Sequence, residues 1–270
     1  MIDLVEEIEN LDAFFHVSTL FSFEDQELLE EKVPHNLVSF KISDYVNVLN
    51  NNKINKDDFE IMICSFEKEL YVLLKNYSNT YTLSKTLAEC LVNERCNGKL
   101  PTIIVRPPSI APSSSEPEVG WYKGIQLYLA LIAAYSFGIL QIGHFKYDWL
   151  LPTISVDILG NLFLASIVKL NSLDKNNLSD HNNNEKGNIV VVNAAPEIQK
   201  LSSVYQLFYA LQNIVTEFPS AKIIRPIARL EDLVPRKTND IIFRIKRFVK
   251  ETVFAYIFDV IGYVIGQKQK

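Results

Sequence analysis

Three short apolar runs, separated by stretches long enough for helices, constrain the fold of this chain most. They are residues 13–18 (AFFHVS), 100–105 (LPTIIV) and 189–193 (IVVVN). Each is rich in β-branched or aromatic side chains and holds no acidic or basic one except His16, which is typical of strands buried on both faces of a sheet. Strands that alternate with helical segments form a parallel sheet, so the sequence predicts an α/β fold.

Composition narrows the function classes. The 270 residues are 48% apolar and 22% charged with a net charge of −5, which excludes a disordered chain and a collagen-like fibre. Charge is uneven: residues 1–31 hold ten acidic and no Lys or Arg side chains, while 222–250 hold nine basic and three acidic ones. We therefore predict no nucleic-acid partner, but leave a local anion-binding face open. The three cysteines and four histidines are scattered without a CxxC motif, so we predict no metal site and a reducing compartment.

One pair of residues suggests acid–base catalysis. Residues 81–97 contain good helix formers and are followed by Gly98, which predicts a helix with a glycine cap. Tyr81 and Lys85 are four residues apart and so share one face of it. A phenol is a poor acid or base at neutral pH, and a neighbouring ammonium favours its phenolate. The same spacing also fits a solvated helical pair, so the motif alone leaves both interpretations open.

The order of the neighbouring motifs adds a resemblance. Hydroxyl groups end the first strand, the Tyr/Lys helix follows, and the second strand ends in Arg106-Pro107, as in the short-chain dehydrogenase/reductase superfamily. Several short sequence motifs within residues 1–165 resemble those of the alcohol-forming fatty acyl-CoA reductases. They are FHVST (15–19), EEKVP (30–34), NTYTLSKTLAE (79–89), VRP (105–107), EP (116–117), GW (120–121) and SVD (155–157) with Asn161. Residues 255–268 resemble the start of that family's C-terminal helical region.

The resemblance implies a role for each matching residue. Tyr81 is the general acid that protonates the substrate oxygen, and Lys85 holds the nicotinamide ribose and stabilises the Tyr81 phenolate. Thr19 hydrogen-bonds the substrate carbonyl, with Ser18 as the second choice, and the segment Pro107, Pro108 and Ser109 flanks the nicotinamide. The family uses NADPH to reduce a long-chain fatty acyl-CoA through a hemithioacetal and an aldehyde to the alcohol. It also implies a place on the cytosolic face of the endoplasmic reticulum or peroxisomal membrane. Chain-length preference and the choice of NADPH over NADH stay open.

The chain also departs from the family pattern. No glycine precedes Gly98, so the glycine-rich phosphate turn of a Rossmann fold is missing. We therefore expect the C-terminal half of a Rossmann-like parallel sheet with a substrate lobe and a helical tail, truncated at both ends relative to the family. After Gly120-Trp121, Tyr122-Lys123 replace the family's usual Asp and Asn, and Gln126-Leu127-Tyr128 replace a Gly/Pro-rich turn.

Two interpretations of function follow from these departures. The chain is an incomplete piece of a reductase, or it is a catalytically degenerate scaffold that binds lipid or a partner protein. Retention of Thr19, Tyr81 and Lys85 favours the first interpretation, and the missing glycine turn favours the second. A third and weaker interpretation is an extended reductase that acts on a sterol or a nucleotide sugar. The EP and GW motifs disfavour it.

The remaining segments complete the predicted organisation. Residues 1–230 form a partial reductase domain with an insertion over 24–75 and a flexible loop over 171–188, and 231–270 form a helical tail. The window 124–145 has no Asp, Glu, Lys or Arg side chain, and we interpret it as buried or as lining an acyl tunnel, with membrane insertion as the alternative. Residues 239–251 predict a helix with one apolar face, placed against the core or, alternatively, near anionic lipid headgroups or the phosphates of coenzyme A.

Overall fold

The chain consists of two compact units. The computed structural model describes residues 2–23, 29–33, 67–68, 71, 74–124, 127–177, 189–196, 201–235 and 240–257. Unit 1 comprises Met1–Trp121 and Thr153–Ala195, and unit 2 comprises Tyr122–Pro152 and Pro196–Lys270. The predicted boundary at residue 230 thus falls inside unit 2. Most of the predicted insertion over 24–75 lies outside the described residues.

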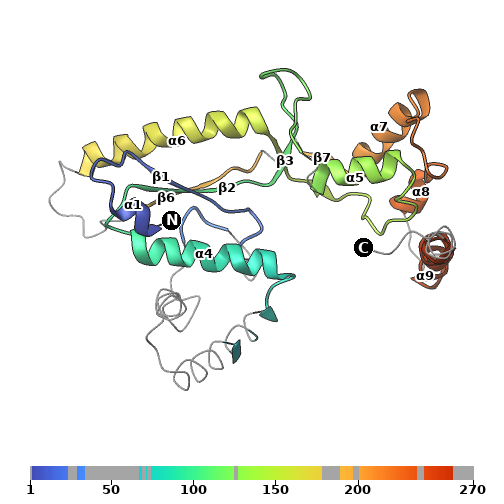
Figure 1. The fold of residues 1–270 in the computed structure, drawn as a ribbon, viewed down its shortest axis with the longest axis horizontal. Coiled ribbons are helices and arrows are strands. Elements are labelled where there is room, and N and C mark those ends of the chain that lie inside the picture. Colours follow the sequence, from blue (N-terminus) through green and yellow to red (C-terminus); the bar gives the residue numbers. More distant parts are fainter. Residues whose placement is uncertain are drawn as a thin grey trace, which may run out of the picture. The chain divides into compact units, whose positions relative to one another are not determined.

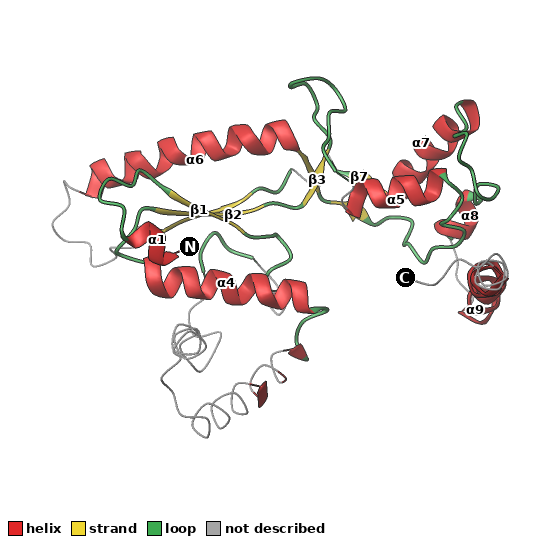
Figure 2. Cartoon of the chain, in the orientation of Figure 1, coloured by secondary structure: helices red, strands yellow, loops and turns green. Residues whose placement is uncertain are grey.

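A three-stranded parallel sheet forms the centre of unit 1 (Figure 2). Its strands are β1 (Phe14–Val17), β2 (Thr102–Arg106) and β6 (Ile189–Asn193), in the order β1-β2-β6. Phe14 lies opposite Thr102, and Thr102 lies opposite Ile189. The three predicted strands and their parallel arrangement are therefore confirmed.

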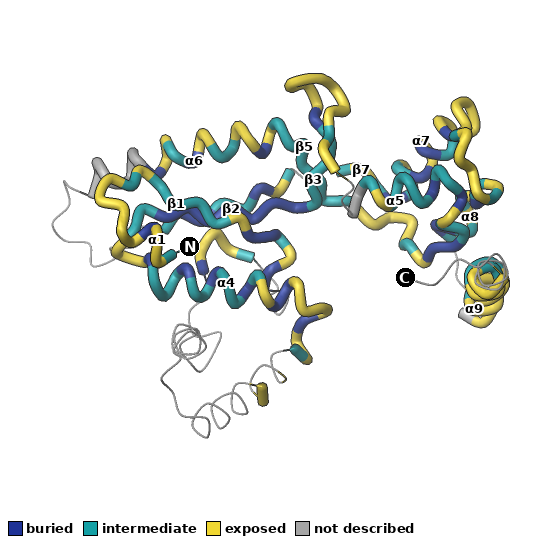
Figure 3. The backbone as a smooth tube through the Cα atoms, viewed as in Figure 1, coloured by how far each residue is buried: buried dark blue, intermediate teal, exposed yellow. Residues whose placement is uncertain are grey.

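Two long helices cover opposite faces of this sheet, α4 (Thr80–Cys96) on one side and α6 (Val156–Asn177) on the other (Figure 1). Alternate residues of β2 point to the two faces. Ile104 packs with Val92 and Cys96 of α4, whereas Ile103 and Val105 pack in a cluster with Leu159 and Leu170 of α6. Every residue of β2 is buried (Figure 3), which explains why its sequence is an unbroken apolar run rather than an alternating one.

Shorter elements complete unit 1. Helix α1 spans Ile2–Glu6, and strand β3 (Ser109–Ala111) pairs in parallel with β5 (Thr153–Ser155). Asp157, in the first turn of α6, accepts hydrogen bonds from the backbone and hydroxyl groups of Ser114 and Ser115. The predicted loop over 171–188 is wrong for residues 171–177, which continue α6, and its remainder lies outside the described residues. Extending an existing helix is far easier than nucleating one, so polar composition alone did not end it.

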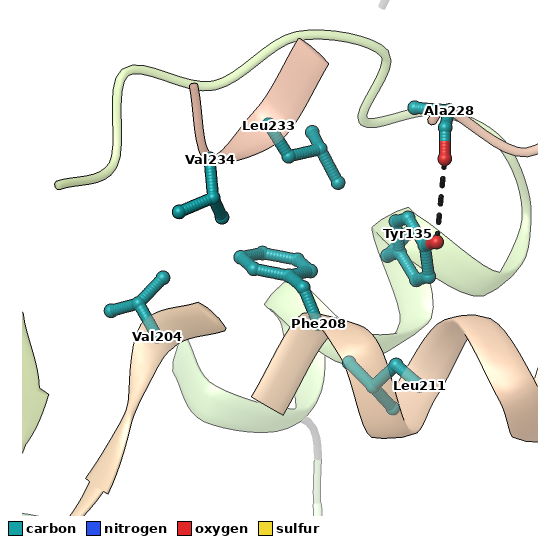
Figure 4. Close-up of a cluster of buried hydrophobic side chains, with 7 residues drawn as sticks. All are labelled: Tyr135, Val204, Phe208, Leu211, Ala228, Leu233 and Val234. Carbon is teal, nitrogen blue, oxygen red and sulfur yellow. Dashed lines mark hydrogen bonds between the residues drawn. The ribbon is translucent and has the colours of Figure 1, made fainter. Parts of the chain in front are cut away.

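Unit 2 is built mainly from helices. They are α5 (Leu127–Ser136), α7 (Val204–Glu217), α8 (Leu230–Leu233), α9 (Asp240–Arg247) and the π-helical η2 (Phe248–Thr252), whose helical course continues to Ile257. A short antiparallel pair joins β4 (Leu150–Leu151) to β7 (Ser202–Ser203). Phe208 lies in the middle of the core, beside Tyr135, whose hydroxyl donates a hydrogen bond to the Ala228 carbonyl at 3.3 Å (Figure 4).

The apolar window over 124–145 forms the short helix α5 followed by an irregular segment. Tyr135 and Ile142 are buried, and Ala134, Ile139 and Leu140 line a cavity of about 520 Å³ within unit 2. In the part of the chain that the structure describes, no helix has both the length and the apolarity needed to cross a bilayer. The burial of Tyr135 and Ile142 and the lining of the cavity support the buried or pocket-lining interpretation of the window.

Candidate active site

Backbone pairing extends past the ends of β1 and β2 and fixes the two hydroxyl residues. The Ser18 amide donates to the Val105 carbonyl at 2.8 Å, and the Leu20 amide donates to the Pro107 carbonyl at 3.0 Å. Ser18 and Thr19 are both buried at the carboxyl end of the sheet. The Thr19 hydroxyl accepts a hydrogen bond from the Phe21 amide at 3.3 Å, whereas the Ser18 hydroxyl has no hydrogen-bond partner among the described residues.

Helix α4 brings Lys85 to the same edge of the sheet. The side chain of its N-cap residue Asn79 accepts a hydrogen bond from the Thr82 amide at 3.0 Å, and this fixes the first turn, which contains Tyr81. One turn later, the Lys85 ammonium donates to the Val17 carbonyl at 3.0 Å. Val17 directly precedes Ser18 and Thr19, so the cation contacts the backbone at the strand end that these two hydroxyl residues follow.

Tyr81 and Lys85 lie on one face of α4, as predicted. The Lys85 Nζ is 6.0 Å from the centroid of the Tyr81 ring, and the ring is 54% exposed. Among the described residues, no hydrogen bond joins the Tyr81 hydroxyl to the hydroxyls of Ser18 or Thr19. Their direct convergence therefore stays a prediction.

The segment after β2 follows the same edge. Pro107 and Pro108 are buried, and Ser109 is half-buried at the start of β3. The hydrogen bond from Leu20 to Pro107 places this segment beside the residues that follow β1. The structure thus brings the predicted cofactor-flanking segment next to the predicted hydroxyl pair.

A buried ion pair that sequence reasoning missed lies beneath this edge. The Arg106 guanidinium contacts both carboxylate oxygens of Glu89, with Nη2 at 2.6 Å from Oε2 and Nε at 3.0 Å from Oε1. Both side chains are fully buried. Arg106 also donates to the carbonyls of Glu30 and Lys32 and to the Asn193 side chain. The pair therefore ties α4, β2, β6 and the segment 29–33 together.

The same ion pair reaches the candidate catalytic loop. The Ser22 hydroxyl lies 3.1 Å from Glu89 Oε1 and 2.8 Å from the Thr19 carbonyl, and the Arg106 guanidinium lies over the Phe23 ring at 5.1 Å. Phe23 also donates its amide to the Thr86 hydroxyl at 3.0 Å. These contacts hold the turn that contains Thr19 in place. The signal for Glu89 was present in the sequence, because it follows Lys85 by four residues on the same helical face.

Two further titratable groups border the site. Burial lowers the pKa of His16, and Lys85 acts in the same direction while Glu89 opposes it. The His16 Nε2 has no hydrogen-bond partner among the described residues. Burial raises the pKa of the Cys90 thiol to about 12, with Glu89 and Glu94 adding to the effect. Cys90 is therefore a structural thiol rather than a nucleophile for a thioester.

The edge formed by Ser18, Lys85 and Pro107 fits the nicotinamide and ribose end of a dinucleotide. Buried hydroxyl groups normally form a hydrogen bond, and the Ser18 hydroxyl has none among the described residues, so it is available to a ligand. The Lys85 ammonium is a hydrogen-bond donor suited to ribose hydroxyls. Neither described helix that follows a strand in unit 1 offers a pyrophosphate site. Asn79 already caps α4, and the first turn of α6 carries the carboxylate of Asp157.

Comparison with known proteins agrees with this geometry. A family model of an NAD-binding domain, described as male sterility protein, matches residues 1–163. The chain belongs to the fatty acyl-CoA reductase family. Among its relatives, the fatty acyl-CoA reductase wat of Drosophila melanogaster is 29% identical over 170 residues, which is 62% of this chain and 30% of the relative. Fatty acyl-CoA reductase 1 of Gallus gallus is 27% identical over 167 residues, with the same two shares.

A plant protein matches a shorter stretch. The probable fatty acyl-CoA reductase 5 of Arabidopsis thaliana is 30% identical over 96 residues, or 36% of this chain and 19% of its own. The matched part of the chain spans about 30% of the length of the animal relatives. The match to an NAD-binding model indicates a nicotinamide dinucleotide as the cofactor, and the α/β fold with its parallel sheet is the one expected of such a domain.

Proposed function

We propose that this chain contributes the catalytic residues of an NADPH-dependent fatty acyl-CoA reductase that converts a long-chain acyl-CoA to the fatty alcohol through the aldehyde. The observation that supports this most is the Lys85 ammonium bound to the Val17 carbonyl, next to two buried hydroxyl residues. A lysine held at a strand end, one helical turn from a tyrosine, is suited to acid–base work beside a carbonyl. The printed names of the relatives point to the acyl-CoA substrate.

Each residue has a distinct task in this proposal. The nicotinamide cofactor, when bound, supplies the hydride. Tyr81 donates a proton to the oxygen of the reacting carbonyl, and Lys85 orients the ribose and stabilises the phenolate that remains. Thr19, or Ser18 in its place, donates a hydrogen bond to the same carbonyl oxygen. Pro107, Pro108 and Ser109 flank the nicotinamide and limit its movement.

The apolar cavity within unit 2 is a candidate binding site for an acyl chain. Apolar side chains from α5 and the segment after it, from Ile224 and from the C-terminal helix form most of its lining, together with Arg225 and Glu251. A chain of methylene groups gains free energy from leaving water in proportion to the area that it buries, about 0.8 kcal/mol per buried methylene. We therefore propose that 124–145 serves substrate binding.

A chimera tests the proposal. Residues 1–163 replace the matching segment of the Gallus gallus relative, and alcohol formation from palmitoyl-CoA is measured with NADPH or NADH. We expect NADPH-dependent alcohol formation, and we expect Tyr81→Phe to lower kcat about 10²- to 10⁴-fold without weakening cofactor binding, because only the proton donor is removed.

The chain supplies its own matched control. Tyr71 and Lys75 repeat the same four-residue spacing, with the Lys75 Nζ 4.9 Å from the Tyr71 ring, and Tyr71 is 64% exposed. Tyr71→Phe should leave kcat unchanged. A chimera that binds NADPH but forms no aldehyde or alcohol, or a Tyr81→Phe variant with native activity, would contradict the proposal and favour the degenerate scaffold.

A further inference from the structure

The C-terminal helix of unit 2 turns its apolar side chains outward. Residues 241, 242, 245, 248 and 249 recur at the spacing of a single helical face. These side chains and two that follow are each between 51% and 70% exposed: Ile241, Ile242, Ile245, Phe248, Val249, Tyr256 and Ile257. We call this set the apolar stripe. The prediction that the apolar face of 239–251 packs against the core is therefore wrong for the described residues.

The opposite, largely polar face attaches the helix to unit 2. Lys246 and Lys250 both pair with Asp232 at the end of α8, at 2.8 and 2.6 Å. Arg225 donates to the Lys250 carbonyl and stacks over the Phe254 ring at 3.8 Å. The Phe243 ring meets His144 edge to face at 4.7 Å. Ion pairs and ring contacts thus hold the largely polar face of the helix against the rest of unit 2. In a surface helix this face normally contacts water.

Charge beside the apolar stripe indicates what it meets. Residues 240–251 hold four basic side chains and two acidic ones, Asp240 and Glu251. Two of the basic side chains, Lys246 and Lys250, form ion pairs with Asp232. Arg244 and Arg247 remain on one border of the stripe, three residues apart, and the Arg247 side chain is 66% exposed although it lies 3.6 Å from Glu251. The exposed surface therefore combines an apolar strip with a border at which Arg244 is a cation and Arg247 forms an ion pair with Glu251.

We propose that the apolar stripe binds the surface of an anionic lipid bilayer, with the helix axis lying in the plane of the headgroups. An exposed apolar strip of this kind gains free energy by entering the boundary between headgroups and acyl chains, and arginines at its border meet anionic lipid phosphates. A second copy of the chain is a poorer occupant in an antiparallel arrangement, because pairing two stripes in that way would bring their arginine borders together. This inference does not depend on the proposed catalytic function.

Vesicle sedimentation of the 270-residue chain tests the proposal. Vesicles of phosphatidylcholine alone are compared with vesicles that also contain phosphatidylserine, at low and high salt. We expect binding only to the anionic vesicles, weakened by salt. Arg244→Gln with Arg247→Gln should reduce binding roughly 25-fold, about fivefold per arginine, and Ile245→Gln with Phe248→Gln should reduce it to the level of neutral vesicles.

Two double variants are the matched controls. Lys99→Gln with Lys222→Gln removes two exposed cations elsewhere, and Leu164→Gln with Val168→Gln removes two exposed apolar side chains of α6. Both should bind like the native chain. Each variant is checked for native circular dichroism, and Phe248→Trp provides a second measurement, since its emission should shift to the blue on anionic vesicles only.

Three outcomes would overturn the proposal. Equal binding to neutral and anionic vesicles at all salt concentrations would show that charge does not contribute to binding. Native binding by the stripe variant, or an unshifted Phe248→Trp emission on bound vesicles, would place the contact elsewhere. A dimer in solution that Ile245→Gln with Phe248→Gln dissociates would assign the apolar stripe to a second copy of the chain.

Discussion

At the scale of single residues, the buried Arg106–Glu89 pair has the largest predicted effect on stability. Arg106→Met leaves the Glu89 carboxylate buried without its cation, and breaking such a pair typically costs about 3–5 kcal/mol of the free energy of unfolding. Urea unfolding of the native and variant chains measures the loss. Arg95→Met is the matched control, because Arg95 pairs with Asp3 and Glu6 near the surface, where ion pairs contribute little. Similar losses in the two variants would contradict the assignment.

His16 makes stability depend on pH. Burial lowers its pKa in the folded chain from the ordinary value of 6.5, so the unfolded chain takes up a proton first as the pH falls. The free energy of unfolding should therefore decrease as the pH drops below about 6.5, by at most about 1.4 kcal/mol per pH unit for this one group.

The measurement is chemical unfolding at several pH values between neutral and mildly acidic, above the range in which carboxylates titrate. His16→Gln should flatten the dependence over this range. A native slope in His16→Gln would show that another group is responsible.

The candidate site was predictable from the sequence only in part. Tyr81 and Lys85 could be placed on one helical face because four residues make about one turn. The same spacing occurs at Tyr71 and Lys75. The spacing alone therefore does not predict a catalytic pair, and the prediction depends on the strand ends that flank the helix. Arg106 could not be assigned, since a cation after a buried strand normally reaches solvent, and its partner Glu89 lies 17 residues away.

At the scale of elements, burial on both faces made the strands predictable. The runs at β1, β2 and β6 stand out because a parallel sheet between two helices needs unbroken apolar strands. The length of α6 and the outward direction of the apolar stripe were not predictable. The direction of the stripe depends on contacts between elements, such as the ion pairs of Asp232 with Lys246 and Lys250, because periodicity indicates that a helix has an apolar face but not what that face contacts. The length of α6 depends on the ease of extending a helix that has already formed.

The N-cap of α4 links an element to the site. Asn79 satisfies the Thr82 amide at the start of the turn that holds Tyr81. Asn79→Ala should lower the free energy of unfolding by about 0.5–2 kcal/mol, and Asn79→Ser should restore most of it, because serine caps nearly as well. Thermal unfolding measures both. Asn97→Ala, at the other end of the same helix, is the matched control and should change the midpoint little.

At the scale of the whole molecule, the predicted catalytic residues all belong to unit 1, whereas the apolar cavity and the apolar stripe belong to unit 2. The chain passes from unit 1 to unit 2 after Trp121, returns at Thr153 and leaves again after Ala195. Each unit therefore includes segments that are distant in the sequence. A boundary drawn at residue 230 from motif order could not reveal this, because motif order records sequence position and not contact.

Cofactor affinity is the property that depends on the molecule as a whole. Within residues 1–270 no glycine precedes Gly98, and a pyrophosphate needs backbone amides at a glycine-rich helix start. Asn79 occupies that position on α4, and the Asp157 carboxylate at the start of α6 repels anions. In the proposed function Ser18, Lys85 and Pro107 contact only the nicotinamide end, and the starts of α4 and α6 offer no pyrophosphate site among the described residues.

We accordingly expect the purified 270-residue chain to show no saturable heat on titration with micromolar NADPH and no measurable turnover. The chimera with the Gallus gallus relative should bind NADPH in the same calorimetric experiment, because the family's glycine-rich turn is expected ahead of the exchanged segment. Micromolar affinity in the 270-residue chain itself would contradict this account. It would mean that residues 1–270 bind the pyrophosphate without a glycine-rich turn, through groups other than the helix starts of α4 and α6.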